Sequence, residues 1–294
     1  MKKQFLIPFL ALLFFGCKTT DFLVEKYTNP QVLPIETSCP AEITWEKVQD
    51  GIEKTEFVIK SENIRWACVK IDLHTPNISI KASPETNQLG KRFIHKKFAQ
   101  ETNSTVALNT VPFDLDGRTY IPVSVVKINN QIVCSVNSHY AALGFIKNPD
   151  NTYNAIIMKN QTEEEVSKCE FAFGGFYQIL NHKTIYQFEK YKRSRTAVGI
   201  SHNGRFLYCF ATAGIACPTG RNGLNFEECA LILQHLGCTQ AMEFDGGHST
   251  GLVLNKKNLI KRFDLLRSWY LPIILLLINI ISFYISQLIC VNLI

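Results

Sequence analysis

The chain has 294 residues, of which 46% are hydrophobic and 19% are charged, and its formal net charge is +6. This length and hydrophobic content are sufficient for one substantial core, and no change of composition along the chain requires a second domain. Because lysine and arginine are spread along the sequence and do not cluster with aromatic residues, the composition argues against nucleic-acid binding, whereas an anionic ligand is compatible with the charge.

The first 17 residues have the pattern of an export signal. Two lysines precede an apolar run, residues 5–15, and a glycine and Cys17 close it. This pattern predicts a signal peptide over residues 1–17 with lipid attachment at Cys17, and an uncleaved N-terminal anchor is the alternative. Residues 18–42 contain three prolines and little periodicity, so they are predicted to be a tether. The expected location is the periplasm or the cell surface, with the protein anchored to the membrane through its lipid.

Short strands are predicted from Ile43 onward. Alternating or β-branched residues indicate strands at Thr55–Lys60, Trp66–Leu73, Asn77–Ala82 and Thr105–Leu108. A helix is predicted over Phe93–Gln100, with His95 on its solvated side.

Four further pairs of strands are separated by turn residues, chiefly asparagine and glycine. They are Pro122–Ile128 with Gln131–Ser135, Ala141–Lys147 with Tyr153–Lys159, Thr196–Ser201 with Arg205–Ala211, and Gly251–Leu254 with Leu259–Phe263. Since only one or two helices are convincing, the predicted fold class is α+β: a β-rich mixed sheet built from hairpins with one or two packed helices, over residues 43–277.

The best-defined unit of the sequence lies between Gly223 and Thr250. Asn225, with Glu228 three residues later, predicts a capping box at the start of a helix that ends near Gly237. A buried strand is predicted at Gln240–Phe244, followed by a polar turn.

Two carboxylates lie at the end of this strand. Because side chains alternate along a strand, Glu243 and Asp245 are predicted to share one face. Gly246 and Gly247 can adopt positive φ and present backbone N–H groups, so the turn is a candidate cradle for an anion. His248 and Ser249 complete the turn.

The C-terminal residues, 269–294, carry no charge, which by length alone would suit a transmembrane helix. Basic residues directly before them oppose that orientation for an exported domain. We therefore predict a last core strand at Tyr270–Leu276 and an apolar extension over residues 278–294, helical if ordered. A disrupted reading frame that replaced the native terminus is the alternative.

Two ordered blocks of residues resemble a known family. The first is Arg195–Gly199 followed by an Asn-Gly turn, and the second runs from Gly223 through the predicted helix to Phe244–Ser249. Both resemble the phosphodiester glycosidase family, which includes the lysosomal uncovering enzyme. Weaker matches are Gly174-Gly175 with Leu180 and Asn181, and Asn109 with Phe113. The resemblance covers roughly residues 60–270, and the departures are Glu243 in place of a frequent asparagine, His248 in place of a third glycine, and Thr110-Val111 in place of a glycine pair.

The resemblance implies a hydrolase that cleaves a sugar 1-phosphodiester of the N-acetylglucosamine type. Such a reaction passes through an oxocarbenium-like state and needs a carboxylate near the sugar C1 and donors for the phosphate. The candidate catalytic residues are Asp245 as stabiliser or nucleophile, Glu243 as a base for water, and His248 as a donor to the leaving oxygen. Arg195 is the candidate phosphate clamp. The other candidate substrate-binding residues are Thr196, Asn109, Gly246, Gly247 and Ser249.

Three alternatives stay open at this point. Asp245 could merely cap a turn while Glu243 pairs with Arg195, which would make the protein a non-catalytic carbohydrate- or phosphate-binding lipoprotein. No cofactor is implied, although the two carboxylates could help to hold Ca²⁺ or Mg²⁺ and are by themselves too few for a metal site. The ten cysteines lack zinc-site spacing, and buried thiols or a few disulfides are both compatible with their positions. The expected partner is a sugar phosphodiester or a cell-envelope glycan.

Overall fold

The computed structural model describes residues 32–82, 95–116, 119–188, 191–215, 222–260, 275–277 and 287–292. The chain divides into two units, Met1–Gln31 and Val32–Ile294, and the fold described below is that of the second. The predicted signal peptide, the lipid site at Cys17 and most of the tether lie outside the described residues.

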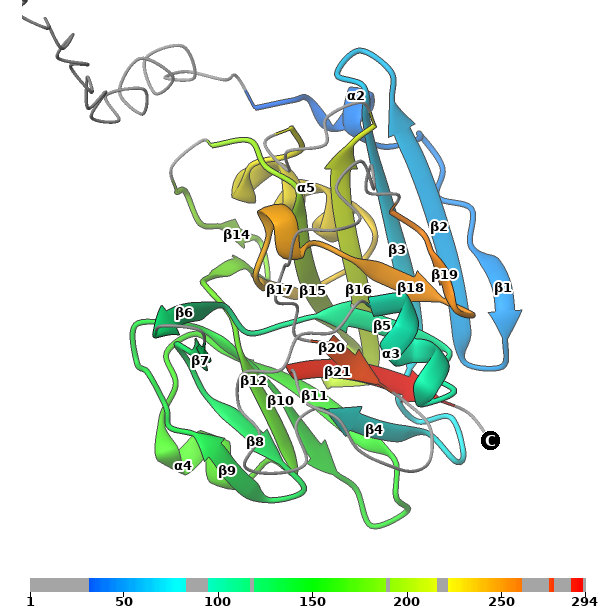
Figure 1. Cartoon of the computed structure of the whole chain (residues 1–294). Coiled ribbons are helices and arrows are strands. Elements are labelled where there is room, and N and C mark those ends of the chain that lie inside the picture. The colour runs from blue at the N-terminus through cyan, green and yellow to red at the C-terminus, as the bar shows by residue number, and fades with distance from the viewer. Residues whose placement is uncertain are drawn as a thin grey trace, which may run out of the picture. The chain divides into compact units, whose positions relative to one another are not determined.

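The largest element of the fold is an eight-stranded antiparallel sheet (Figure 1). Its order is β1 (Glu46–Gln49), β2 (Ile52–Ile59), β3 (Ile64–Asp72), β16 (Phe206–Gly214), β15 (Arg195–Ser201), β17 (Gln240–Glu243), β13 (Gln178–Asn181) and β14 (Thr184–Ile185). Every neighbouring pair is antiparallel. The strand that carries Glu243 is therefore an inner strand, with β15 on one side and β13 on the other.

The other strands of the described residues form three smaller sheets. A five-stranded sheet has the order β11 (Tyr153–Met158), β10 (Ala142–Lys147), β12 (Phe171–Gly174), β8 (Val126–Ile128) and β9 (Gln131–Cys134). A six-stranded sheet has the order β19 (Lys257–Asn258), β18 (Leu252–Leu254), β5 (Val106–Asn109), β20 (Leu275–Leu277), β21 (Gln287–Asn292) and β4 (Ser79–Ala82). The strands β6 (Phe113–Asp116) and β7 (Thr119–Pro122) form a hairpin.

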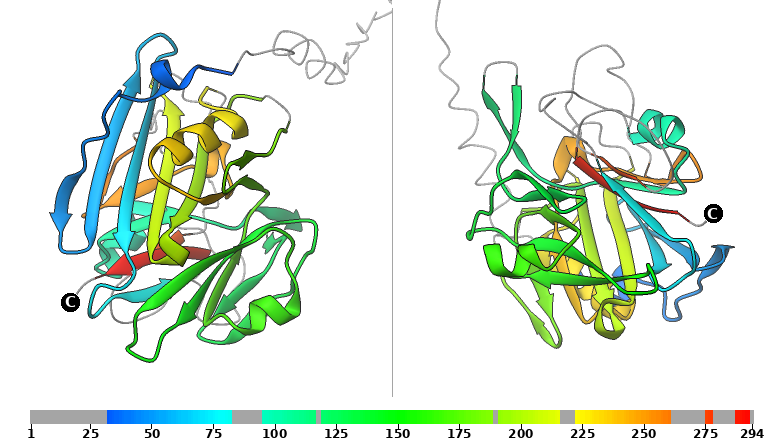
Figure 2. Two further views of the ribbon diagram at one scale, coloured as in Figure 1. Left: turned by 180° about the vertical axis from the view of Figure 1, so that it is seen from behind. Right: turned by 90° about the horizontal axis from the view of Figure 1, so that it is seen from below.

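The helices are few and short. They are α2 (Ile35–Ser38), α3 (His95–Glu101), α4 (Glu163–Ser167), α5 (Phe226–His235) and two 3-10 turns, η1 (His202–Gly204) and η2 (Gly247–Ser249). Seen from behind, α5 covers one face of the eight-stranded sheet, where it packs on β13 and β17 (Figure 2). The fold is thus a β-rich α+β fold, as the hairpin pattern predicts.

Two hydrophobic clusters hold these layers together. The larger one joins the eight-stranded sheet to the five- and six-stranded sheets and includes Val198, Met242 and Phe244. The second lies on the opposite face, between the sheet and α5, and includes Ala241 and Cys229. Alternation along β17 therefore directs Met242 into one core and Ala241 into the other, so the strand is buried on both faces.

The predicted hairpins are confirmed at β8–β9, β10–β11 and β15–β16. The first of these turns on Asn129 and Asn130, whose φ angles are 47° and 66°. Positive φ at both central residues is typical of a type I′ turn, whose twist matches that of the flanking strands. The capping box of α5 is also as predicted: the Asn225 side chain accepts from the Glu228 amide and Glu228 accepts from the Asn225 amide.

Three predictions differ from the structure. His95 is buried, because its ring packs against Gly251, where a Cβ would come within 2.6 Å of it. The end of the predicted tether is not a free linker: the Leu33 amide donates to Glu228 and the Trp66 indole donates to the Ser38 carbonyl. The expected helical extension instead contains the strand β21, which pairs with β4 and β5.

The strand β20 lies at the end of the predicted last strand, Tyr270–Leu276, and the preceding residues lie outside the described ones. None of the helices in the described part of the chain has both the length and the apolar character needed to cross a bilayer.

The contacts of Glu228 at the start of α5 predict an effect on stability. The Glu228 carboxylate is buried, accepts from the Leu33 and Asn225 amides at 2.9 Å each, and lies 3.3 Å from the Lys192 ammonium. Glu228→Ala should lower the free energy of unfolding by about 2–3 kcal/mol, because it removes the cap and leaves buried donors unpaired. Denaturant unfolding measures this, with Glu227→Ala, in the same helical turn, as a control that should cost less than about 1 kcal/mol. Equal losses for both variants would show that Glu228 acts only through the helix dipole.

Candidate active site

The predicted site lies where β15 begins and where β17 and β5 end. The Phe244 amide donates to the Thr196 carbonyl at 2.9 Å, and the Asp245 amide donates to the Thr110 carbonyl at 2.8 Å. The first bond continues the β15–β17 pairing past the end of β17. The second bond joins the chain to the residues that follow β5. Asp245 is therefore held by its main chain on two sides, between two sheets.

The Asp245 carboxyl group is the most accessible of the acidic candidates. It is half-buried, and it accepts from the Gly246 amide at 2.9 Å and from the Ser249 hydroxyl. Burial raises the pKa of Asp245 to about 6, and the Ser249 hydroxyl and the Gly246 amide oppose part of that rise because they stabilise the charged form. Asp245 is therefore ionised at neutral pH and becomes protonated in mildly acidic solution.

The Glu243 carboxyl group has a different environment. It is fully buried on the face of β17 that meets α5, and neither of its oxygens has a hydrogen-bond partner within the described residues. Burial raises the pKa of Glu243 to about 8, although the Arg195 guanidinium and the nearby Cys229 thiol favour the charged form. At neutral pH Glu243 is mainly protonated, so it is poorly suited to take a proton from water.

Arg195 lies in the same buried region. Its Nε donates to the Leu224 carbonyl at 3.1 Å, its Nη2 donates to the Tyr191 carbonyl at 2.7 Å, and its guanidinium lies 4.2 Å from the centre of the Phe226 ring. The described residues place no carboxylate within 4.0 Å of it, and burial lowers the pKa of Arg195. One edge of the guanidinium fork is thus occupied by carbonyls, and any bond to a phosphate would use the remaining Nη donors.

Asn109 connects the strands around the site. Its Nδ2 donates to the Asp245 carbonyl at 2.6 Å, and its Oδ1 accepts from the Thr196 hydroxyl at 2.7 Å and from the Gly251 amide at 3.1 Å. Asn109 and Thr196 are both buried. Their polar groups are used within the chain, so in this conformation they position Asp245 and do not face a ligand.

The glycines of the turn also bond internally. The Gly246 amide donates to the Asp245 side chain, and the Gly247 amide donates to the Ser194 carbonyl at 2.7 Å. The expected open cradle of amides is therefore not present in this conformation. Gly246 lies against β15, where a Cβ would come within 2.8 Å of the Ser194 carbonyl, and Gly247 has a φ of 58°.

The remaining candidates lie on either side of Asp245. His248 is exposed in η2, whereas Ser249 is buried against Asp245. The structure thus brings Asp245, Ser249, Asn109 and Thr196 into one hydrogen-bonded group next to Arg195, while Glu243 faces α5. Within the described ranges no group of three or more histidine, cysteine, aspartate or glutamate side chains has the arrangement of a metal site.

Comparison with known proteins decides the family. The model of a phosphodiester glycosidase domain matches residues 102–276, which is more than half of the chain. The chain belongs to the phosphodiester glycosidase family. The match contains both blocks of residues on which the resemblance rests, together with Asn109, Arg195 and Asp245. A search of curated proteins gave no match.

Solved structures share the fold of this phosphodiester glycosidase domain. The catalytic domain of zebrafish N-acetylglucosamine-1-phosphodiester alpha-N-acetylglucosaminidase, auto-inhibited by its pro-peptide, aligns with a TM-score of 0.62 at 19% identity over 84% of this chain and 85% of that one. A hypothetical protein from Synechocystis aligns with a TM-score of 0.57 at 14% identity over 75% of this chain and 61% of that one. A putative exported protein from Burkholderia pseudomallei gives 0.51 at 11% identity, over 67% and 70%.

Several residues of the site are not evident in the sequence. The carbonyls of Tyr191 and Leu224 hold Arg195, the carbonyl of Thr110 holds Asp245, and the Cys229 thiol lies beside Glu243. Main-chain carbonyls carry no sequence signal, so these contacts could not be predicted. Phe226 had a signal, since it is the first residue of a well-capped helix that begins beside the site.

The environment of Glu243 predicts a pH-dependent stability. Because its pKa rises from 4.5 in the unfolded chain to about 8 in the folded protein, its contribution to stability is complete below about pH 4.5 and is lost as the pH rises through 8. Glu243→Gln should flatten this decline and raise the free energy of unfolding at pH 8.5 by on the order of 3 kcal/mol relative to the wild type. Chemical unfolding between pH 4.5 and 8.5 measures it, with the exposed Glu163→Gln as control. A wild-type stability that rises over this range would contradict the assignment.

The bonds of Asn109 predict a second effect. Asn109→Ala should lower the free energy of unfolding by about 2–4 kcal/mol, because the Asp245 carbonyl, the Thr196 hydroxyl and the Gly251 amide each lose a buried partner. Thermal or denaturant unfolding measures the loss. Asn154→Ala, which removes a half-buried amide that bonds His74 and Asn148 on the far hairpin, is a control of matched chemistry and should cost less than half as much.

Proposed function

We propose that the protein is an exported, lipid-anchored hydrolase that cleaves the glycosidic bond of a sugar 1-phosphodiester, with N-acetylglucosamine as the type of sugar. The observation that carries the proposal is Asp245: a half-buried, ionisable carboxylate at a strand end, fixed by main-chain bonds within the residues that match the phosphodiester glycosidase family. The name of the zebrafish protein of the same fold supports the choice of sugar and bond.

The reaction breaks the bond between the sugar C1 and the phosphate oxygen and forms a new bond between C1 and a water oxygen. The departing phosphate monoester keeps the electron pair, and its oxygen is stable without a proton at neutral pH. The Asp245 carboxylate stabilises the positive charge that develops at C1, or attacks C1 as a nucleophile. The proton of the attacking water is released to solvent or to the phosphate.

The surrounding residues support Asp245 in this scheme. Arg195 supplies positive charge beside Gly246, since a Cβ at Gly246 would lie 3.8 Å from the Arg195 Cδ. His248 is exposed on the same turn and is a candidate donor to the phosphate. Because Glu243 is buried and mainly protonated at neutral pH, we propose that it does not act as the base.

A second function is a non-catalytic binding protein for a carbohydrate or a phosphate. The observation that favours it is the internal bonding of the Gly246 and Gly247 amides and of the Arg195 fork, which leaves few donors for a transition state. The proposed location, periplasm or cell surface with a lipid at Cys17, rests on the sequence of the first 17 residues. Metabolic labelling with a fatty acid, compared with Cys17→Ala, tests the anchor.

A substrate panel separates hydrolase from binding protein. Purified protein that begins at Val32, within the predicted tether, is incubated with sugar 1-phosphodiesters and nucleotide sugars, and release of free sugar is measured. Release from a phosphodiester supports the hydrolase. Binding without release supports the second function.

Asp245→Asn should abolish turnover while the protein stays folded. The amide keeps the size of the side chain but cannot stabilise positive charge or attack C1. For the wild type, kcat/KM should rise as the pH increases through about 6, since Asp245 must be ionised in the free enzyme. Sugar release and circular dichroism measure activity and folding, and the exposed Asp114→Asn is the control. A folded Asp245→Asn with normal sugar release would remove Asp245 from the mechanism.

A further inference from the structure

A cluster of aromatic rings lies beside Arg195. The cluster comes from four separate segments of the chain and consists of Tyr140, Phe176, Tyr177, Phe188 and Phe226. Tyr177 and Phe188 are stacked, with ring centres 4.9 Å apart and planes 20° from parallel. Phe226 meets the edges of both, at 6.2 Å from Tyr177 and 5.4 Å from Phe188. These rings belong to one continuous surface.

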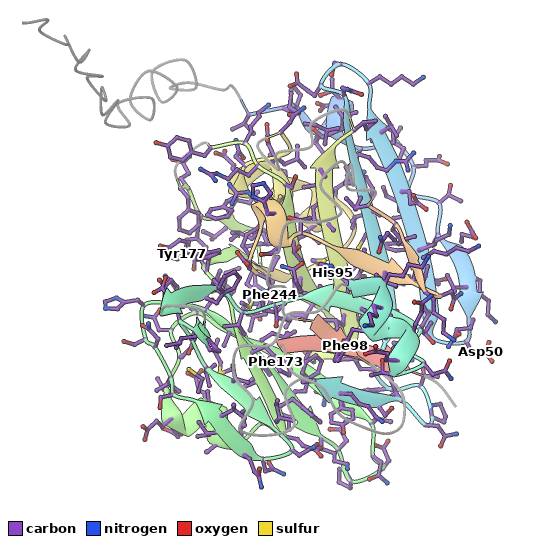
Figure 3. All side chains as sticks on the ribbon, viewed as in Figure 1. Asp50, His95, Phe98, Phe173, Tyr177 and Phe244 are labelled. Carbon is purple, nitrogen blue, oxygen red and sulfur yellow. The ribbon has the colours of Figure 1, made fainter. Side chains whose placement is uncertain are left out.

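The cluster is unusual because its rings are not buried. Tyr177 is 39% exposed, and the other four residues are half-buried. In a hydrophobic core, such rings would be shielded from water. Tyr177 lies toward the edge of the molecule in Figure 3, whereas Phe244, also labelled there, lies near its middle. Exposed aromatic rings that gather in one place mark binding surfaces more often than isolated ones do.

Main-chain bonds fix this cluster relative to the site. The Glu243 amide donates to the Tyr177 carbonyl at 3.0 Å, and the Phe176 amide donates to the Glu243 carbonyl at 2.7 Å. Tyr177 is therefore attached to the strand that leads directly to Asp245. These bonds fix the main chain of Tyr177, and so the point from which its ring projects, relative to the end of β17.

The contacts also give an order of groups. Gly246, next to Asp245, lies against Arg195, Arg195 lies over Phe226, and Phe226 meets Tyr177 and Phe188. In the proposed reaction Asp245 faces the sugar C1 and Arg195 faces the phosphate. The next group in this series of contacts is the aromatic cluster, which we therefore assign to the alcohol part of the phosphodiester, the aglycone.

We propose that Tyr177 is the stacking surface for the aglycone and that it selects aglycones containing a ring with an apolar face. The inference rests on the proposed function, because the order of groups is read from the sugar through the phosphate. An aromatic ring binds the C–H face of a pyranose and the face of a nucleobase by the same contact. Aglycones without a ring gain nothing from Tyr177.

The test uses three phosphodiesters of the same sugar that differ only in the aglycone: methanol, a hexose joined through its 6-hydroxyl, or a nucleoside joined through its 5′-hydroxyl. Tyr177→Ala should lower kcat/KM for one or both ring aglycones by about three- to tenfold and leave the methyl ester unchanged. The hexose and nucleoside arms show which ring the site accepts. Tyr177→Phe, which keeps the ring, should retain wild-type selectivity.

Tyr186→Ala is the matched control. Tyr186 directly follows β14, and its ring lies 4.6 Å from the Lys159 ammonium and does not belong to the cluster, so its removal should affect all three esters alike or none. Equal kcat/KM values of the wild type and Tyr177→Ala for every ester would overturn the inference and leave the proposed function intact. So would an equal loss for the methyl and ring esters.

A binding measurement keeps the two proposals distinguishable. The product side of the reaction is mimicked by hexose 6-phosphate, a nucleoside 5′-monophosphate and methyl phosphate, and their affinities are measured by calorimetry. Should the wild type hydrolyse no ester yet bind a ring phosphate more tightly than methyl phosphate, with the difference lost in Tyr177→Ala, the hydrolase fails and the ring site stands. Absence of both hydrolysis and ring-dependent binding would refute both.

Discussion

The site depends on one buried amide. Asn109 ends β5 and bonds simultaneously to the main chain of Asp245, to the hydroxyl of Thr196 on β15 and to the amide of Gly251 before β18. Thr196 lies in the eight-stranded sheet and Gly251 directly precedes β18 of the six-stranded sheet, so Asn109 links two sheets that also share the larger apolar core. Apolar contacts are not directional, so they cannot fix the loop that carries Asp245 to within a hydrogen-bond length. Asn109 supplies that precision, and Gly246, packed against the Ser194 carbonyl, allows the loop to approach closely enough.

Much of the fold could be predicted from the sequence where local chemistry decides. The α5 helix begins and ends as its capping residues indicate, and the β8–β9 and β15–β16 hairpins turn at the asparagine and glycine residues that favour positive φ. The short strands β12 and β13 were not predicted, because four apolar residues have no period that separates a strand from a loop. His95 was placed wrongly, since its burial depends on Gly251, more than 150 residues away.

The candidate site could also be predicted from the sequence only in part. Asp245, Gly246 and Arg195 could be selected from the sequence because they form ordered blocks, and the structure brings them together. The protonation of Glu243 could not be predicted. Alternation in a strand gives the direction of its side chain but not the groups that cover it, which are α5 and its Cys229 thiol. Glu243 therefore places a carboxyl group where a neutral side chain fits the environment, and burial keeps it mainly neutral at pH 7.

Seven cysteines whose side chains the structure describes are free thiols, and all except Cys134 are buried. Burial raises the pKa of Cys39 to about 12 and that of Cys169 to about 11, and it raises the pKa values of Cys68, Cys229 and Cys238 well above the ordinary value. Since thiol reagents attack the thiolate, these side chains are protected both by lack of access and by their protonation. Cys68, Cys209 and Cys229 lie in β3, β16 and α5, and Cys39 and Cys238 pack in the cluster between the large sheet and α5. Cys169 packs in a separate cluster with residues of the five-stranded sheet. The rate at which a thiol reagent labels the buried cysteines beside the large sheet therefore reports how often that sheet opens, without any cysteine having to be introduced.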